Sequence, residues 1–247
     1  DFLSLLKSDL KIQKTNIVLE ELDITQLNKL SIIIKPSNFK SLLNNRIKGG
    51  KLVSEIEIFL TDSGNLKNFI AKGKVKELKA NLLNDLSFTK GDFNFFADKN
   101  DILIKNIKGN LETIKITDGD IKLNLEDGIN LSSNFNSKFN FDEDFLIKYN
   151  KISKKYKIIN YIKALKGDLN NNISISLDKT YKVKDYNFNI KGKIEKGEFQ
   201  LAKPFKNNFI KEEIKKVHLS DLQITTNFTT NTTILKTEGK YSFNNLD

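Results

Sequence analysis

Apolar and polar residues alternate along most of this chain, and this period of two constrains the fold more than any other feature of the sequence. IKLNL (121–125) and YNFNI (186–190) place an apolar side chain at every second residue, and FNSKFNF (135–141) places Phe135, Phe139 and Phe141 on one side. ISISL (173–177) follows the same pattern, and LKTEGKYSF (235–243) places Leu235, Tyr241 and Phe243 on one side. Because successive side chains of a β-strand point to opposite faces, the alternation predicts strands with one apolar and one polar face.

Short sequences typical of turns separate these runs. They are DSGN (62–65), TKGD (89–92), DKND (98–101), TDGD (117–120) and LEDG (125–128). Asp-Gly and Asn-rich pairs favour the positive φ angles of tight hairpins. Strands that recur about every 8–12 residues with short connections predict a mainly β fold built as an antiparallel meander.

Helical patterns are few. The strongest is the run at 142–167, where apolar residues step by three or four, acidic residues crowd the start and lysines the end, and Gly167 is a suitable stop. Short helices are also predicted at 37–46, after Pro36, and at 207–216.

The helical insert at 142–167 separates two strand-rich parts, 1–141 and 168–247. The alternation resumes after the insert in the same style, so we interpret residues 1–247 as one segment with a single sheet system. Since the chain begins with Asp and contains no Met, we expect it to be a piece of a larger, elongated protein.

The net charge of +10 raises nucleic acid as a partner, but the type of basic residue argues against it. Only Arg46 is an arginine among the 41 basic residues, and the lysines are spread along the whole chain. Readers of phosphates and bases usually rely on the bidentate arginine fork. We therefore expect no nucleic-acid partner.

The chain offers few groups for catalysis. It has no cysteine, and its one histidine, His218, lies in a strand-like run that explains it as a structural residue. The acidic pair Asp118 and Asp120 falls in a turn sequence, and the acidic run 142–144 is placed to cap a helix. We expect no enzymatic activity, no cofactor and no metal site.

Glycines recur inside the strand-like runs AKGKV, IKGNL, IKGKI and TEGKY, at Gly73, Gly109, Gly192 and Gly239. Glycine inside a strand costs roughly 0.5–1 kcal/mol relative to alanine, and it usually marks a bulge, a bend or a close approach of backbones. Glycines and bulges are also the features that curve a sheet. We predict that these four glycines are bend points of a strongly curved and twisted sheet.

The run at 8–34, with two short strands joined by a polar turn, and the run at 69–125, with its strand–Gly–x–apolar recurrence, resemble a known family. They are similar to the repetitive periplasmic region of AsmA-like proteins, in particular the YhdP/TamB branch of Gram-negative bacteria. The resemblance covers most of the chain. It rests on the recurrence of strands and glycines along the sequence and not on a specific motif.

The resemblance implies a long twisted antiparallel sheet that curls into an open, taco-like β-groove with an apolar inside. It implies a parent protein anchored in the inner membrane by a segment outside this chain and extending through the periplasm. Such proteins are thought to carry phospholipid towards the outer membrane, for outer membrane biogenesis, as bridge-like lipid transfer proteins do. The family brings no catalytic residues.

An apolar groove suits acyl chains, because burial of each CH₂ gains on the order of 0.8 kcal/mol without a specific contact. The residues predicted to line it are Ile121, Leu123, Leu125, Phe135, Phe139, Phe141, Phe188, Ile190, Phe228, Tyr241 and Phe243. For each of them, a place in a filled core is the competing interpretation.

Two other functions fit the same pattern. One is a closed β-sandwich or β-solenoid that acts as an adhesin or another surface interaction module, with a dry core and no lipid. The other is a basic sheet that binds nucleic acid or anionic lipid headgroups through its lysines, which would make binding fall steeply with salt.

Overall fold

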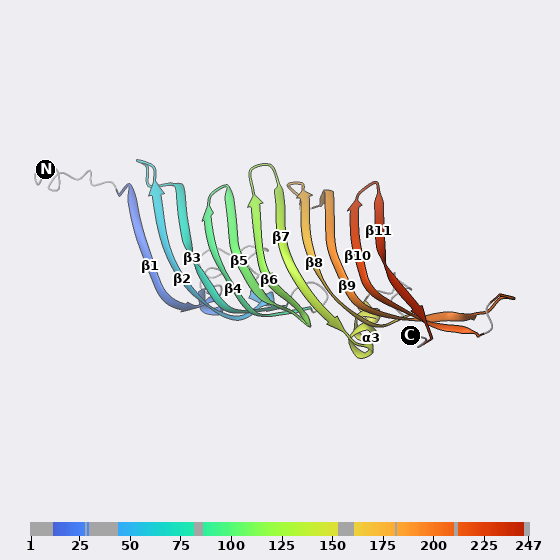
Figure 1. The fold of residues 1–247 in the computed structure, drawn as a ribbon. Helices are drawn as coiled ribbons and strands as arrows, with labels where there is room; N and C mark the ends of the chain where they lie inside the picture. Colours follow the sequence, from blue (N-terminus) through green and yellow to red (C-terminus); the bar gives the residue numbers. More distant parts are fainter. Residues whose placement is uncertain are drawn as a thin grey trace, which may run out of the picture.

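Eleven antiparallel strands form one open sheet in the order β1 to β11, so each strand pairs only with its neighbours along the chain (Figure 1). This computed structural model describes residues 12–27, 29, 44–81, 86–152, 161–180, 182–209 and 212–244. β1 and β11 form the two edges, and within these residues there is no second sheet. The predicted antiparallel meander is confirmed, and a closed sandwich is not what the described residues form.

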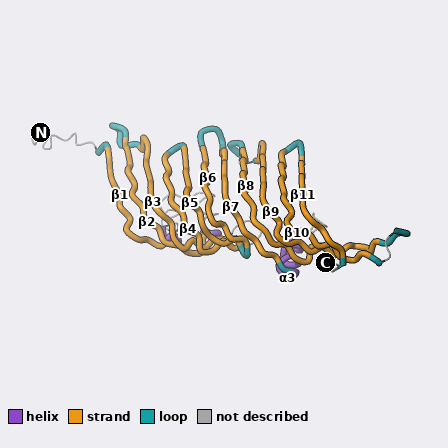
Figure 2. Tube along the Cα trace, in the orientation of Figure 1, coloured by secondary structure: helices purple, strands orange, loops and turns teal. Residues whose placement is uncertain are grey.

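The strands are β1 (Lys14–Asp23), β2 (Ile47–Leu60), β3 (Leu66–Asn81), β4 (Ser87–Asp98), β5 (Asp101–Leu111), β6 (Ile114–Asn124), β7 (Ile129–Phe141), β8 (Ile162–Leu177), β9 (Val183–Phe205), β10 (Ile214–Thr229) and β11 (Thr233–Phe243). One helix, α3 (Glu143–Ile152), follows β7. In Figure 1 the strands descend side by side and sweep to one side in their lower parts. Strand makes up nearly all of the described trace (Figure 2).

The predicted turns divide into two groups. DSGN and LEDG are turns, and their glycines have the expected positive φ, 77° at Gly64 and 99° at Gly128. DKND joins β4 to β5. TKGD and TDGD were wrongly predicted as turns, because they lie inside β4 and β6. Their Gly-Asp pairs lie at β-bulges within the strands instead of at turns. The bulges appear as register shifts between Thr89 and Asp92 in β4 and between Ile116 and Asp118 in β6.

The helical insert predicted over 142–167 is correct only in its first part. α3 ends at Ile152, and β8 begins at Ile162, while 153–160 lie outside the described residues. Leu165 pairs with Phe141 of β7 across the sheet. The apolar residues of 162–167 fit a period of two as well as three or four, and pairing with β7 selects the strand. The second strand-rich part therefore starts at Ile162.

The two short helices were predicted with mixed success. Residues 44–46 are helical, and the rest of the helix predicted at 37–46 lies outside the described residues. The helix predicted at 207–216 is wrong, because 207–209 and 212–213 are turn or loop and β10 starts at Ile214, while 210–211 lie outside the described residues. A helical turn that was not predicted covers 24–27, where the Asp23 side chain accepts the N–H of Thr25 at 2.7 Å.

Bulges recur in the middle of the strands and bend them. Left-handed φ angles of 52°, 52°, 57° and 53° occur at Glu77, Lys90, Asn106 and Asp221, each beside a register shift. A bulge adds one residue to a strand, bends it and increases its twist.

Two of the bulges are held by an aspartate of the next strand. Asp92 accepts the N–H of Glu77 at 3.0 Å, and Asp120 accepts the N–H of Asn106 at 3.1 Å. Each Asp follows a glycine in β4 or β6, so the Gly-Asp pair supplies a partner to a backbone N–H that the bulge removes from the ladder.

Burial is shallow throughout. Among the described residues no large side chain is fully buried. The most buried apolar residues, at 5–9% exposure, are Leu52, Val75, Ala80, Phe88, Ile107, Phe139, Leu146, Ile194 and Ile214. The core is therefore a shallow layer of side chains on the sheet, to which α3 adds Leu146.

Candidate functional site

Strand register assigns every paired residue to one of two faces, which we call the apolar face and the polar face. Residues directly opposite each other in an antiparallel pair point to the same side. One row on the apolar face crosses all eleven strands through Leu19, Ser54, Gly73, Phe95, Ile104, Ile121, Ser133, Ile173, Phe188, Phe228 and Thr233. Eight of these eleven are apolar or glycine, so the face is continuous from edge to edge.

The structure places ten of the eleven predicted lining residues on the apolar face. They are Ile121 and Leu123 of β6, Phe135, Phe139 and Phe141 of β7, Phe188 and Ile190 of β9, Phe228 of β10, and Tyr241 and Phe243 of β11. Leu125 is the exception, since it follows the end of β6 and donates its N–H to the carbonyl of Asn100 in the neighbouring turn.

Exposure varies widely within this set. Phe139 is only 7% exposed, whereas Tyr241 at the edge is 67% exposed. Phe139 stacks on Phe141 with ring centroids 4.9 Å apart, so it serves as core. Phe188 is half-buried and meets Tyr186 at 5.4 Å, which leaves part of its ring on the surface.

A pocket of about 320 Å³ opens on the apolar face over the strands β3 to β7. It is lined by Leu78, Ala80, Phe88, Phe93, Ile104, Ile107, Leu111, Ile116, Ile121, Ser133 and Phe135. Only one of these residues, Ser133, carries a polar side chain. Of the residues predicted from the sequence, Ile121 and Phe135 line it, and the rest of the lining was missed.

The helix α3 covers the apolar face where β7 ends. Its Phe145 stacks on Phe141 with centroids 4.5 Å apart, and Leu146 is 8% exposed. Asp142 caps the helix by accepting the N–H of Phe145 at 2.9 Å, as the acidic start of this run predicted. Glu143 pairs with Lys163 of β8, which fixes the helix to the sheet.

The four predicted bend glycines lie in β3, β5, β9 and β11 on the apolar face, and none has a positive φ. A Cβ on Gly73 would overlap the carbonyl oxygen of Val53 and lie 2.9 Å from Cα of Ser54. A Cβ on Gly192 would lie 2.8 Å from Cα of Leu169. Close approach of neighbouring strands thus requires glycine here, and the bend itself stays a prediction for these positions.

The other two predicted glycines are crowded in the same way. A Cβ on Gly109 would lie 2.6 Å from Cζ of Phe88, and one on Gly239 would lie 2.6 Å from Cα of Leu222. Gly167, which was predicted only as a helix stop, belongs to the same class, because its Cβ would lie 3.1 Å from Cα of Ile194.

A small polar cluster on the apolar face was not predicted from the sequence. Asn171 is 7% exposed and donates its side-chain N–H groups to Ser137 Oγ at 2.9 Å and to the carbonyls of Phe135 and Leu169. Thr226, in the same row two strands away, is 5% exposed. The sequence did contain a signal for this cluster: an Asn or a Ser stands at a position where the alternation of the run would place an apolar residue.

The polar face carries cross-strand ion pairs. Lys105 of β5 meets Asp120 of β6 at 2.6 Å, and Lys193 of β9 meets Asp221 of β10 at 2.6 Å. The hydrogen bond from Lys105, reinforced by the N–H of Asn106, lowers the pKa of Asp120. The hydrogen bond to Asp221 raises the pKa of Lys193.

The described residues include the one histidine of the chain and several carboxylates, and their arrangement bears on metal binding. His218 lies on the polar face opposite Glu198 and Ser242. No group of three His, Cys, Asp or Glu side chains among the described residues is placed to hold a metal ion. No helix within the described ranges is long and apolar enough to cross a membrane.

Comparisons with protein-family models, with curated proteins and with solved structures found no match for this chain.

Proposed function

We propose that this chain is a segment of an AsmA-like inter-membrane lipid-transport protein, and that its apolar face holds phospholipid acyl chains. The curved sheet then acts as an open β-groove with the acyl chains inside and the headgroups at its rim. The parent protein would be anchored in the inner membrane outside this segment and would act in the periplasm, without catalysis or a cofactor.

One observation carries the proposal: a row in which eight of eleven residues are apolar or glycine crosses all eleven strands, and no second sheet among the described residues covers it. Neighbouring strands lie about 4.8 Å apart, so the row is about 48 Å long. A soluble protein that buried such a face would normally pack it against a second layer. A continuous apolar strip suits sliding acyl chains, because each buried CH₂ gains about 0.8 kcal/mol wherever it lies.

The pocket over β3 to β7 is the first place where we expect an acyl chain to bind. Its lining is almost wholly apolar, and the ring of Phe88 forms its floor against Gly91 and Gly109. The absence of side chains at the two glycines lets this ring lie close to the sheet.

Lipid occupancy of the purified 247-residue chain tests the proposal. Native mass spectrometry and solvent extraction should find co-purifying phospholipid, and a fluorescent fatty acid should bind with little dependence on salt. No phospholipid and no fatty-acid binding would contradict the proposal. Binding that falls steeply with salt would favour the headgroup-binding alternative.

A matched pair of variants locates the bound lipid. Phe188→Asp places a charge on the apolar face, between Ile173 and Phe228, and should weaken fatty-acid binding by at least about tenfold, or 1.4 kcal/mol. Asn189→Asp places the same charge on the polar face one residue later and should leave binding unchanged. Circular dichroism checks that both variants fold. Equal effects of the two variants on binding would contradict the assignment of the apolar face.

A further inference from the structure

Register brings two lysines directly opposite each other at three places on the polar face. The three pairs are Lys51 with Lys76, Lys115 with Lys138, and Lys166 with Lys196. Like charges that face each other directly across two strands destabilise a sheet. Lys51 relieves the repulsion by binding Glu21 at 2.8 Å, and in the third pair Lys166 binds a glutamate, Glu195, at 2.6 Å. No carboxylate among the described residues binds either lysine of the pair in β6 and β7.

Two further lysines lie beside this pair and also lack an ion pair with a described residue. Lys90 of β4 and Lys108 of β5 line a surface pocket of about 590 Å³ together with Lys115. Asn110 and Thr117 contribute polar side chains to the same pocket, and Thr117 also lines the adjoining hollow that contains Lys138. We call Lys90, Lys108, Lys115 and Lys138 the lysine cluster. All four are exposed.

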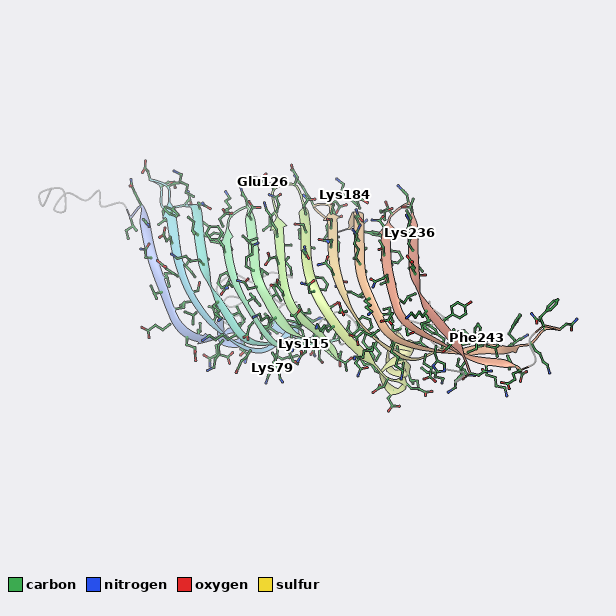
Figure 3. All side chains as sticks on the ribbon, viewed as in Figure 1. Lys79, Lys115, Glu126, Lys184, Lys236 and Phe243 are labelled. Atoms are coloured by element: carbon green, nitrogen blue, oxygen red, sulfur yellow. The ribbon has the colours of Figure 1, made fainter. Side chains whose placement is uncertain are left out.

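β-Bulges in three successive strands surround the pocket. Lys90 of β4 and Asn106 of β5 have left-handed φ angles of 52° and 57°. The register of β6 shifts between Ile116 and Asp118. A bulge bends its strand and changes the direction of the side chains beside it. Figure 3 shows Lys115 in the lower part of the sheet, far from Glu126 at the upper end.

The carboxylates nearest to the cluster have other partners or lie between two lysines. Asp92 lies opposite Lys108 but accepts the backbone N–H of Glu77 at 3.0 Å. Asp168 lies opposite both Lys138 and Lys193. Neither aspartate forms an ion pair with the cluster. The repulsion between the lysines therefore stays unrelieved by the described part of the chain.

We propose that the lysine cluster binds a ligand with two phosphate monoester groups. Two such groups carry about three to four negative charges at neutral pH, which matches four lysines. Neighbouring strands lie about 4.8 Å apart, so the cluster extends over about 14 Å from β4 to β7 and has room for two phosphates side by side. Lysine binds phosphate as a point charge and does not need the arginine fork. Asn110 and Thr117 can donate hydrogen bonds to phosphate oxygens between the lysines.

Calorimetric titration of the 247-residue chain with inorganic pyrophosphate tests the proposal. In low salt the dissociation constant should lie below about 1 mM and should be at least about fivefold lower than that of orthophosphate. Lys115→Gln and Lys138→Gln should each weaken binding by at least about fivefold. Added sodium chloride should weaken binding to the wild type, because salt screens exposed charges.

Lys122→Gln is the matched control for binding. Lys122 is exposed on the polar face of the same strand, opposite Leu103 and Ser132, about 20 Å or more from Lys115. This distance exceeds the Debye length of about 10 Å at 0.1 M salt, so the change should alter the dissociation constant less than about twofold. If Lys122→Gln weakens binding as much as Lys115→Gln does, the assignment to the cluster is overturned.

The stability of the ligand-free chain gives a second readout. Lys115→Gln should raise the urea midpoint in low salt, because it removes an unrelieved repulsion. Lys166→Gln should not raise it, since Glu195 already neutralises Lys166. A midpoint that falls for Lys115→Gln as much as for Lys166→Gln would show that Lys115 is not strained by its neighbour and would overturn this part of the argument.

The two phosphates can belong to a soluble ligand or to neighbouring headgroups of a lipid surface. Co-sedimentation with phosphatidylcholine vesicles containing about one fifth phosphatidic acid separates these sources. Vesicle binding that is lost in Lys115→Gln assigns lipid headgroups, and pyrophosphate binding without vesicle binding assigns a soluble ligand. Binding of neither probe, or vesicle binding that Lys115→Gln retains, overturns the proposal. The site is independent of the apolar face, so fatty-acid binding should be unchanged in Lys115→Gln.

Discussion

The apolar face and the polar face of the sheet belong to the same strands, yet different contacts hold them. On the apolar face neighbouring strands approach so closely that glycine is required at Gly73 and Gly192. On the polar face long side chains reach across the strands, as Lys105 does to Asp120. The apolar face depends on shape, and the polar face depends on many weak and replaceable polar contacts.

Two neighbouring asparagines of β8 show the same difference between the polar face and the apolar face. Asn170 lies on the polar face and donates its side-chain N–H groups to Asn134 at 3.1 Å and to Asn136 at 2.9 Å. Asn171, the next residue, lies on the apolar face and bonds buried acceptors. Water can replace the partners of Asn170 but not those of Asn171, so chemically equal residues should differ in what their loss costs.

The largest expected difference in stability between substitutions on the two faces is at Gly73. Gly73→Val should destabilise the fold by about 3 kcal/mol or more, because the new side chain would collide with backbone atoms of β2 that cannot move aside. Urea denaturation followed by circular dichroism measures the free energy of unfolding.

The matched control for Gly73 is the next residue of β3. Lys74→Val introduces the same side chain on the polar face, where valine favours the strand, and should change stability by less than about 0.5 kcal/mol. If Gly73→Val proves as stable as Lys74→Val, close packing at this glycine does not hold in solution.

A moderate difference in stability is expected between alanine substitutions of Asn171 and Asn170. Asn171→Ala leaves the hydroxyl of Ser137, itself 5% exposed, without its donor and should cost about 1–3 kcal/mol. Asn170→Ala should cost less than about 0.5 kcal/mol. Thermal and urea unfolding of both variants give the comparison, and a larger loss for Asn170→Ala would reverse the assignment of the two faces.

The smallest effect is expected from an ion pair of the polar face. The pKa of Asp120 is lowered in the folded chain, so its stabilisation is fully present above the unfolded pKa of about 3.9 and is lost as pH falls through the folded value. The Asp120 side chain is 43% exposed, so Asp120→Asn should cost under about 1 kcal/mol at neutral pH.

Unfolding free energies of the wild type and Asp120→Asn, measured between neutral pH and about pH 2.5, test this interval. The two curves should converge as pH falls, since protonation removes the charge that the variant lacks. Lys105→Gln removes the same pair from the other strand and should reduce the same pH dependence. Parallel curves over the whole interval would contradict a stabilising role for the pair.

The period of two in the sequence was sufficient to predict the strands, the meander and the face to which ten of eleven candidate residues belong. It could not separate turns from bulges, because Gly-Asp pairs such as Gly119–Asp120 serve in both. It could not end the helix correctly either, because Ile162 and Leu165 fit helical and strand spacing alike. Only pairing selects the strand, of Leu165 with Phe141 in β7 and of Ile162 with Phe199 in β9.

The pocket and the polar cluster depend on register, which no local pattern encodes. Ser137 and Asn171 are 34 residues apart in sequence and meet only because β7 and β8 pair without a shift. The lining of the pocket combines five strands in the same way. Such sites can be found once the partner of each strand is known, since a shift of one residue would move them to the other face.

The strictly sequential order of the strands also has a mechanical and kinetic consequence. Because each strand of the described sheet pairs only with the strands before and after it, the sheet behaves as a quasi-one-dimensional chain of hairpins, whose stability is a sum over neighbours. Contacts of low sequence separation form quickly, so strands can add to the sheet one by one in the order in which the chain is made. Force applied at the two ends would peel strands from the edges one at a time, and the hairpins that remain would keep their pairing.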